Sequence, residues 1–322
     1  MRLVDFAAQC DRRKVVPLMG FPGVQLTGFS VRQILFNSDA QVKTAKALYE
    51  HLRPDALFQV MDLSVEANAL GLQVRYPLHE SPSVEDHPVK SVRGLDQFAK
   101  IDILKDGRVM AFVEAMRRMK EAIDVPCGGY VIGPFSLAGR LMGESEAAMC
   151  AIDDPSTLEQ ILEFATERII RYGKALVEAG ADMIAVLEPT GVILSPTQFR
   201  QFSGKYVKRI FNELDTIGIL HICGSSTHII PDMCNTGAQG LSLDSDVNLR
   251  AAMEMLPPDV VMIGNLDPVA VVAHSTPQEV YAAARELLDS MSEYPNFILS
   301  SGCDLPPETP LNNIRAMIDA CK

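Results

Sequence analysis

The sequence predicts an α/β protein whose fold is a (β/α)8 barrel. Eight short apolar runs alternate with longer segments along the whole chain. The runs are apolar at consecutive positions, which is typical of parallel strands buried on both faces. A length of 322 residues suits eight such units plus an insertion, because these barrels typically need about 250 residues. No break in composition divides the chain, so we expect one barrel domain over residues 1–322.

Eight segments are the expected strands. In chain order they are Val15–Met19, Ala56–Met61, Cys127–Ile132, Met183–Leu187, Ile219–Ile222, Gly240–Leu243, Val260–Ile263 and Phe297–Ser300. The gap between the second and third strands, residues 66–126, is longer than one helical unit requires. Its turn-rich sequence YPLHESPS at residues 76–83 predicts a rim or lid element inserted there.

Helix signals lie between the expected strands. A capping hydroxyl stands before a proline in the first helical position at Ser195-Pro196, Thr276-Pro277 and Thr309-Pro310. A long amphipathic helix is predicted after Asp154, because apolar residues recur every three or four positions from Leu158 to Leu176. We expect it to end at Gly180, since glycine readily adopts the left-handed conformation of a helix terminus.

Composition excludes several classes of protein. A net charge of −12 makes nonspecific binding to nucleic acid or to an anionic membrane unfavourable. No apolar run approaches the roughly 20 residues of a membrane helix, and the N-terminus has no signal-peptide pattern. Seven cysteines without framework spacing favour a reducing compartment over disulfides. We therefore expect a cytoplasmic enzyme.

Two expected strands end beside soft metal ligands. His221 and Cys223 lie at the end of one strand, and Cys303 follows the last strand. One imidazole and two thiols form a ligand set that zinc selects. Three protein ligands leave one position for substrate or water, which is the pattern of a catalytic zinc site. Each residue alone has an ordinary alternative, as a small buried thiol or a hydrogen-bonded core histidine, but the three together favour a metal.

The other cysteines are expected to have no metal role: Cys10, Cys127, Cys150, Cys234 and Cys321. Cys234 and His228 follow the metal segment closely, but their polar stretch resembles the next helix, so we expect them to face away.

Polar groups follow most of the other strands, where barrel enzymes place their chemistry. They include Asp62, Glu188, Asp244, Asn265 and Asp267. The last three could equally cap the following helices, so both roles stay open for them.

Several segments resemble the uroporphyrinogen decarboxylase superfamily, over nearly the whole chain. They are GPFSLA at 133–138, AGAD at 179–182, VLEP at 186–189, LSPTQF at 194–199 and GCDLPPETPLNN at 302–313. The resemblance implies a (β/α)8 barrel of the uroporphyrinogen decarboxylase type, with the active site in its mouth.

Residues that differ from the decarboxylase motifs indicate the branch of the superfamily. The decarboxylase carries an arginine-rich N-terminal segment, whereas residues 19–25 read MGFPGVQ, and it has a histidine where Cys303 stands. Asp62 does match the decarboxylase aspartate. The His-x-Cys and distant Cys pattern instead resembles the methylcobamide:coenzyme M methyltransferases, which implies His221, Cys223 and Cys303 as zinc ligands. The resemblance places Glu188 as a fourth ligand or as a group that orients one.

The resemblance implies a zinc-dependent methyltransferase acting between a corrinoid and a thiol such as coenzyme M. The methylcobamide would be free or carried by a separate corrinoid protein, because the chain lacks the DxHxxG carrier motif. The reverse direction, from a methoxyarene or methylated thiol to the corrinoid, stays open. So does a noncatalytic binding protein. The sequence leaves the oligomeric state open, with a homodimer as one alternative. We expect Arg140 to form a salt bridge on a helix face.

Overall fold

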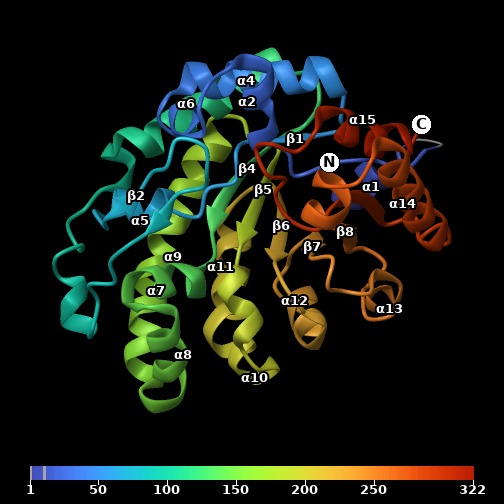
Figure 1. The fold of residues 1–322 in the computed structure, drawn as a ribbon. Helices are drawn as coiled ribbons and strands as arrows, with labels where there is room; N and C mark the ends of the chain where they lie inside the picture. The colour runs from blue at the N-terminus through green and yellow to red at the C-terminus, as the bar shows by residue number, and fades with distance from the viewer. Residues whose placement is uncertain (1, 10–11) are drawn as a thin grey trace.

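The computed structural model describes residues 2–9 and 12–322. Its main sheet has seven parallel strands in the order β1-β4-β5-β6-β7-β8-β9, curled into a barrel (Figure 1). The strands are β1 (Leu57–Phe58), β4 (Cys127–Ile132), β5 (Met183–Leu187), β6 (Ile217–Ile222), β7 (Gly240–Leu243), β8 (Val261–Leu266) and β9 (Phe297–Ser301). The predicted barrel is confirmed.

The eighth position of the barrel is occupied by the extended segment 14–18. Val15 forms an isolated parallel bridge with Leu299 of β9. On its other side, the Val15 carbonyl accepts a hydrogen bond from the backbone N–H of Asp55 at 3.0 Å, just before β1. The first and last parts of the chain therefore meet to close the ring of strands.

Pro17 explains why the predicted strand Val15–Met19 is only a bridge. Proline has no N–H to donate to a strand ladder. The next backbone N–H, that of Leu18, bonds the Ser301 hydroxyl at 3.1 Å instead of a main-chain carbonyl. Side-chain hydroxyls thus replace the ladder along this part of the barrel.

The predicted strand Ala56–Met61 is also shorter in the structure, where β1 covers Leu57–Phe58. The backbone of Gly20 crosses this strand closely, since a Cβ on Gly20 would lie 2.6 Å from Cα of Val60. No side chain fits at residue 20, because the backbone beyond β1 lies against it. The other six predicted strands agree with the structure within three residues at each end.

Helices connect the strands and cover the outside of the barrel (Figure 1). The α-helices are α1 (Leu3–Ala8), α2 (Val24–Thr27), α3 (Val31–Phe36), α4 (Ser38–Leu52), α5 (Val65–Ala69), α6 (Gly107–Ala122), α7 (Pro134–Met142), α8 (Glu144–Asp153), α9 (Pro155–Glu178), α10 (Pro196–Phe199), α11 (Lys205–Glu213), α12 (Ile230–Cys234), α13 (Leu249–Met253), α14 (Pro277–Ser290) and α15 (Leu311–Asp319). No helix in the described ranges is both long and apolar enough to cross a membrane.

The predicted helix signals are confirmed at two of three sites. Ser195 and Thr276 form capping boxes at the starts of α10 and α14. At the third site α15 begins one residue late, with Pro310 as its cap. Thr309 is fully buried and its hydroxyl has no hydrogen-bond partner, so it does not cap the helix. The helix α9 has the predicted span, and Gly180 follows it with φ 104°.

Residues 66–126 hold more than a single helix between two strands. A short antiparallel pair, β2 (Val74–Arg75) and β3 (Ser83–Val84), precedes two 3-10 turns and then α6. A role as a rim or lid stays a prediction.

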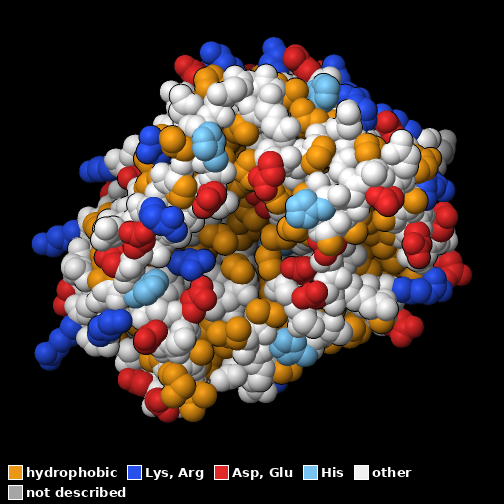
Figure 2. Space-filling view, in the orientation of Figure 1, with side chains coloured by type: hydrophobic (Ala, Val, Ile, Leu, Met, Phe, Trp, Pro, Cys, Tyr) orange, Lys and Arg blue, Asp and Glu red, His pale blue; other side chains and the backbone are white. Residues whose placement is uncertain are grey.

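Two apolar cores result from this architecture. The larger core lies between the strands and the helices that cover them. The smaller one fills the barrel, with Phe58, Tyr130 and Ile219 among the strand residues and Leu3 and Phe6 from α1. In Figure 1 α1 lies near β8, which it contacts. Figure 2 shows this face of the molecule hollowed near its centre, with apolar side chains at the bottom of the hollow.

Candidate metal centre

The structure brings His221, Cys223 and Cys303 together. His221 lies near the end of β6, Cys223 follows that strand, and Cys303 follows β9. The Cys223 sulfur lies 3.0 Å from His221 Nε2 and 3.3 Å from the Cys303 sulfur, and Cys303 lies 3.8 Å from Nε2. In the described part of the chain, this is the one group of three or more His, Cys, Asp or Glu ligand atoms that lie within 4.8 Å of one another.

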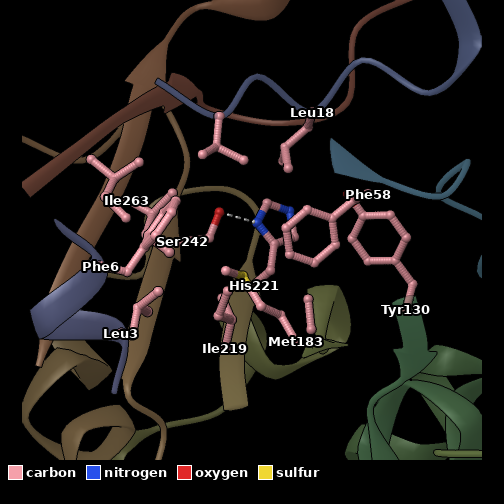
Figure 3. A pocket seen from close by; sticks show the side chains of 13 residues that line it. Leu3, Phe6, Leu18, Phe58, Tyr130, Met183, Ile219, His221, Ser242 and Ile263 are labelled. Carbon is pink, nitrogen blue, oxygen red and sulfur yellow. Dashed lines mark hydrogen bonds between the residues drawn. The ribbon is translucent and has the colours of Figure 1, made fainter. Parts of the chain in front are cut away.

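Strand pairing fixes the orientation of the imidazole. His221 lies opposite Ser242 in the β6–β7 register, and Nδ1 is 2.9 Å from the Ser242 hydroxyl (Figure 3). Nε2 faces the two sulfur atoms. If Nδ1 carries the proton and donates it to Ser242, Nε2 has a free lone pair for a metal.

The two thiols form a close, partly buried pair. The hydrogen bond from Cys223 lowers the pKa of Cys303, whereas donation to Cys303 and burial raise the pKa of Cys223. The thiolate is the form of cysteine that binds metals. The donor set therefore fits a soft or borderline divalent ion such as zinc, with three protein ligands and one coordination position left open.

The Glu188 carboxylate is not part of this group of ligand atoms. Its role, as a fourth ligand or as a group that orients one, stays a prediction. Its Oε1 accepts hydrogen bonds from the backbone N–H and the hydroxyl of Ser136 at 2.6 and 2.5 Å. Its Oε2 accepts from the Phe135 N–H and the Ser203 hydroxyl, both at 3.0 Å. The carboxylate thus occupies the N-terminus of α7, where free N–H groups favour an anion. Burial nevertheless raises its pKa above the ordinary glutamate value.

Glu188 still connects to the metal cluster through the backbone. Its N–H donates to the His221 carbonyl at 2.9 Å. A Cβ on Gly133 would lie 2.5 Å from the Glu188 carboxyl carbon, so the glycine makes room for the buried side chain.

Asp62 lies in a separate buried network rather than in the cluster. One carboxylate oxygen accepts hydrogen bonds from the N–H and hydroxyl of Ser64 at 2.8 and 2.7 Å. The other faces the guanidinium of Arg108 in an ion pair whose side chains are 1% and 0% exposed. Arg108 also donates to the Tyr76 hydroxyl at 2.8 Å, so this pair joins α6 to the segment after β1. A catalytic role for Asp62 stays a prediction.

The three residues with two open roles have different surroundings. Asp267 caps the turn after β8, accepting from the N–H groups of Val269 and Ala270. The Asn265 amide donates to two carbonyls of the β7 loop at 2.7 Å. The Asp244 carboxylate accepts from the Gly224 N–H at 2.8 Å, directly after Cys223. In the structure all three therefore organise loops around the cluster.

The structure also bears on the predictions for His228, Cys234 and Arg140. His228 bonds the Leu194 carbonyl at 3.0 Å, and Cys234 packs near the Met255 carbonyl, so both lie outside the cluster as predicted. Arg140 forms the predicted salt bridge with Glu144 at 2.8 Å. Cys10 lies outside the described residues.

A small cavity inside the barrel adjoins His221. Its volume is about 20 Å³, room for about one water-sized group. Its lining comprises Leu3, Phe6, Val16, Leu18, Phe58, Tyr130, Met183, Ala185, Ile219, His221, Ser242, Ile263 and Ile298 (Figure 3). Sequence reasoning missed Ser242 and Tyr130. Both are polar groups inside otherwise apolar or glycine-rich strands, and that pattern was the available signal.

The fold and the site together define a parallel (β/α) barrel with a cluster of one imidazole and two thiols at the carboxyl ends of its strands. The chain belongs to the uroporphyrinogen decarboxylase (URO-D) family, whose model matches residues 13–322.

Several of its relatives are methyltransferases. A methylcobamide:CoM methyltransferase, MtbA of Methanosarcina mazei, is 31% identical over 294 residues, covering 89% of this chain and 85% of the relative. MtaA of Methanosarcina barkeri is 30% identical and covers 88% and 84%. A solved methyltransferase structure from Methanosarcina mazei is 28% identical, with a TM-score of 0.90 over 99% of this chain and 96% of that one.

Proposed function

We propose that this protein transfers a methyl group from a methylated corrinoid to a small thiol, with zinc held by His221, Cys223 and Cys303. The observation that carries the proposal is the cluster itself, because the ligand atoms converge within 4.8 Å at the strand ends. The methylcobamide:CoM methyltransferase names of its relatives favour this chemistry over decarboxylation.

When bound, zinc would supply Lewis acidity that lowers the pKa of a thiol from its free value of about 8.5 and keeps it as the thiolate. The protein contributes the rest. Ser242 holds Nδ1 of His221, so that Nε2 faces the cysteines.

The transfer requires no general acid, because its electrons balance without the uptake of a proton. The thiolate sulfur forms a bond to the methyl carbon, and the carbon–cobalt bond of the methylcorrinoid breaks. The electron pair of that bond stays with cobalt, so the products are a thioether and a cob(I) corrinoid. We infer that the corrinoid is presented by a separate protein or binds free, since a small cavity of about 20 Å³ cannot enclose it.

The proposal extends to the setting of the enzyme. The six described cysteines are free, which suits the reducing cytoplasm. A homodimer stays a prediction.

Turnover of methylcobalamin tests the proposal. Methylcobalamin plus coenzyme M or 2-mercaptoethanol should give the methyl thioether and the absorbance of cob(I)alamin. Binding of the thiol should release about one proton per zinc, because a zinc-bound sulfur is a thiolate. Cys303→Ala should abolish turnover and zinc binding, while Cys234→Ala should change neither, because Cys234 lies outside the cluster. Full zinc occupancy in Cys303→Ala would refute the ligand assignment.

The same assay decides the direction. Demethylation of a methoxyarene by cob(I)alamin, without any thiol methylation, would favour the reverse reaction.

A further inference from the structure

Cys223 and Cys303 are the one pair of cysteines in the described chain whose sulfur atoms are in contact. The two atoms lie 3.3 Å apart, although the residues are 80 positions apart in the sequence. The other described cysteines have no such contact with a second sulfur, and they are Cys127, Cys150, Cys234 and Cys321. The contact therefore distinguishes this pair from the other four.

The geometry of the pair is close to that of a disulfide. A disulfide bond is about 2.05 Å long, so the two sulfur atoms have to approach by only about 1.3 Å. Both residues lie just beyond the ends of their strands, Cys223 after β6 and Cys303 after β9. Rotation of the two side chains and a small shift of their loops can supply this approach while the strands stay in place.

The pair is also accessible to a small oxidant. Cys223 and Cys303 are partly exposed, whereas Cys127 and Cys321 are buried. A redox-sensitive cysteine is typically accessible and lies next to a second cysteine that resolves its oxidised form. Cys223 and Cys303 meet both conditions. The remaining partly exposed cysteines meet only the first, because they have no sulfur neighbour in the described ranges.

We propose that hydrogen peroxide converts Cys223 and Cys303 into a reversible disulfide that excludes zinc from the site. The formation of the bond needs only the two thiols, whereas the loss of zinc rests on the proposed function. A cysteine binds a metal as the thiolate, and the sulfur atoms of a disulfide are no longer thiolates. After oxidation only His221 remains of the three ligands, so zinc and the disulfide exclude each other.

The oxidation balances with peroxide as the only co-reactant. One thiol sulfur attacks a peroxide oxygen, the oxygen–oxygen bond breaks, and the departing hydroxide takes the thiol proton to give water. The sulfenic acid then reacts with the second thiol, which closes the sulfur–sulfur bond and releases a second water. The two sulfur atoms lose two electrons and the peroxide gains them. A dithiol such as dithiothreitol reverses the step by thiol–disulfide exchange.

Thiol counting and peptide mapping test the disulfide in the reduced, zinc-free chain. After treatment with peroxide, the denatured natural protein should show five titratable thiols instead of seven, and dithiothreitol should restore all seven. Mass spectrometry of a non-reduced digest should find the peptides of Cys223 and Cys303 linked. When the zinc-loaded protein is oxidised, a chromophoric chelator should detect about one zinc released per disulfide, because both thiolate ligands are lost together.

Cys234→Ala is the matched control, because Cys234 is partly exposed but has no sulfur neighbour in the part of the chain that the structure describes. This variant should lose two thiols like the natural protein, whereas Cys223→Ala should form no intramolecular link. A link of Cys223 or Cys303 to another cysteine, no link at all, or zinc retained by the linked protein would overturn the inference and leave the methyl transfer intact. If the natural protein forms the link but transfers no methyl group, the proposed function fails and the disulfide stands.

Discussion

Ser242 sets which nitrogen of His221 faces the two cysteines. Its hydroxyl lies 2.9 Å from Nδ1, and the two residues are direct partners in the β6–β7 register. We predict that Ser242→Ala lowers zinc affinity by about tenfold to a hundredfold, because a metal-bound histidine then loses the group that fixes its tautomer and orientation. Competition with a chromophoric chelator measures this affinity.

Ser300→Ala provides the control for that variant. Ser300 is also a buried strand serine, but its hydroxyl bonds the Val16 carbonyl at 2.7 Å, away from His221. This substitution should lower the free energy of unfolding and leave zinc affinity unchanged. Equal zinc affinities in the natural protein and Ser242→Ala would remove Ser242 from the metal centre.

Asp62 has two possible roles. Its sequence motif indicates catalysis, whereas its surroundings indicate that it stabilises the fold. The ion pair with Arg108 is almost completely buried. Removing one partner leaves an uncompensated buried charge, which typically costs about 3–5 kcal/mol. We predict that Asp62→Ala loses this much free energy of unfolding in urea. The double variant Asp62→Ala/Arg108→Met should recover part of the loss.

The alternative outcome for Asp62 is equally definite. If Asp62→Ala is as stable as the natural protein and binds zinc but does not transfer methyl groups, the residue is catalytic. The ion pair would then be incidental to the fold.

The loop after β7 lies between the segment that holds Cys223 and the segment that holds Cys303. On one side, Asp244 accepts from the Gly224 N–H next to Cys223. On the other side, a Cβ on Gly302 would lie 2.5 Å from the backbone nitrogen of Ser245. The distance between the two sulfur atoms is therefore set by this loop and by the absence of a side chain at residue 302.

Gly302→Ala tests this arrangement. The added methyl group must push the Cys303 loop away from Ser245, because the atom it meets belongs to the backbone. Displacing a reacting group by about 1 Å can cost about a hundredfold in rate, so we expect a large loss of turnover and weaker zinc binding. The control is Gly107→Ala at the start of α6, where the new methyl group meets nothing within 4 Å. Unchanged turnover in Gly302→Ala would contradict the role of the loop.

At the scale of the whole molecule, the sequence patterns of single strands predicted the strands themselves. They did not predict the contacts between distant segments. The run Cys127–Ile132 is apolar or small throughout and has the bounds of β4, and the ligand cluster follows from residues at two strand ends. The bridge at segment 14–18 depends on Pro17 and on Ser301 far along the chain, which local periodicity does not reveal. The surroundings of Glu188 could not be predicted for a similar reason, because its four donors come from α7 and from Ser203.

The buried carboxyl of Glu66 links the stability of the whole fold to pH. Its Oε1 accepts from the Ile132 N–H at 2.9 Å, while Oε2 is buried without a partner. Burial raises the pKa of Glu66 from 4.5 to about 7. The folded state therefore holds a proton that the unfolded chain releases between these values. Its contribution to stability is present below about pH 4.5 and is lost as the pH rises to about 7.

We predict that Glu66→Gln is more stable than the natural protein at pH 8, by roughly 2–3 kcal/mol, and nearly equal to it at pH 5. The amide oxygen still accepts from Ile132, but the buried site no longer has to hold a charge. Urea unfolding at the two pH values measures the difference. Glu213→Gln is the control, because it removes only an exposed partner of Lys174 and should have a small effect at both. A Glu66→Gln effect of the same size at pH 5 and pH 8 would show that the carboxyl does not titrate in this window.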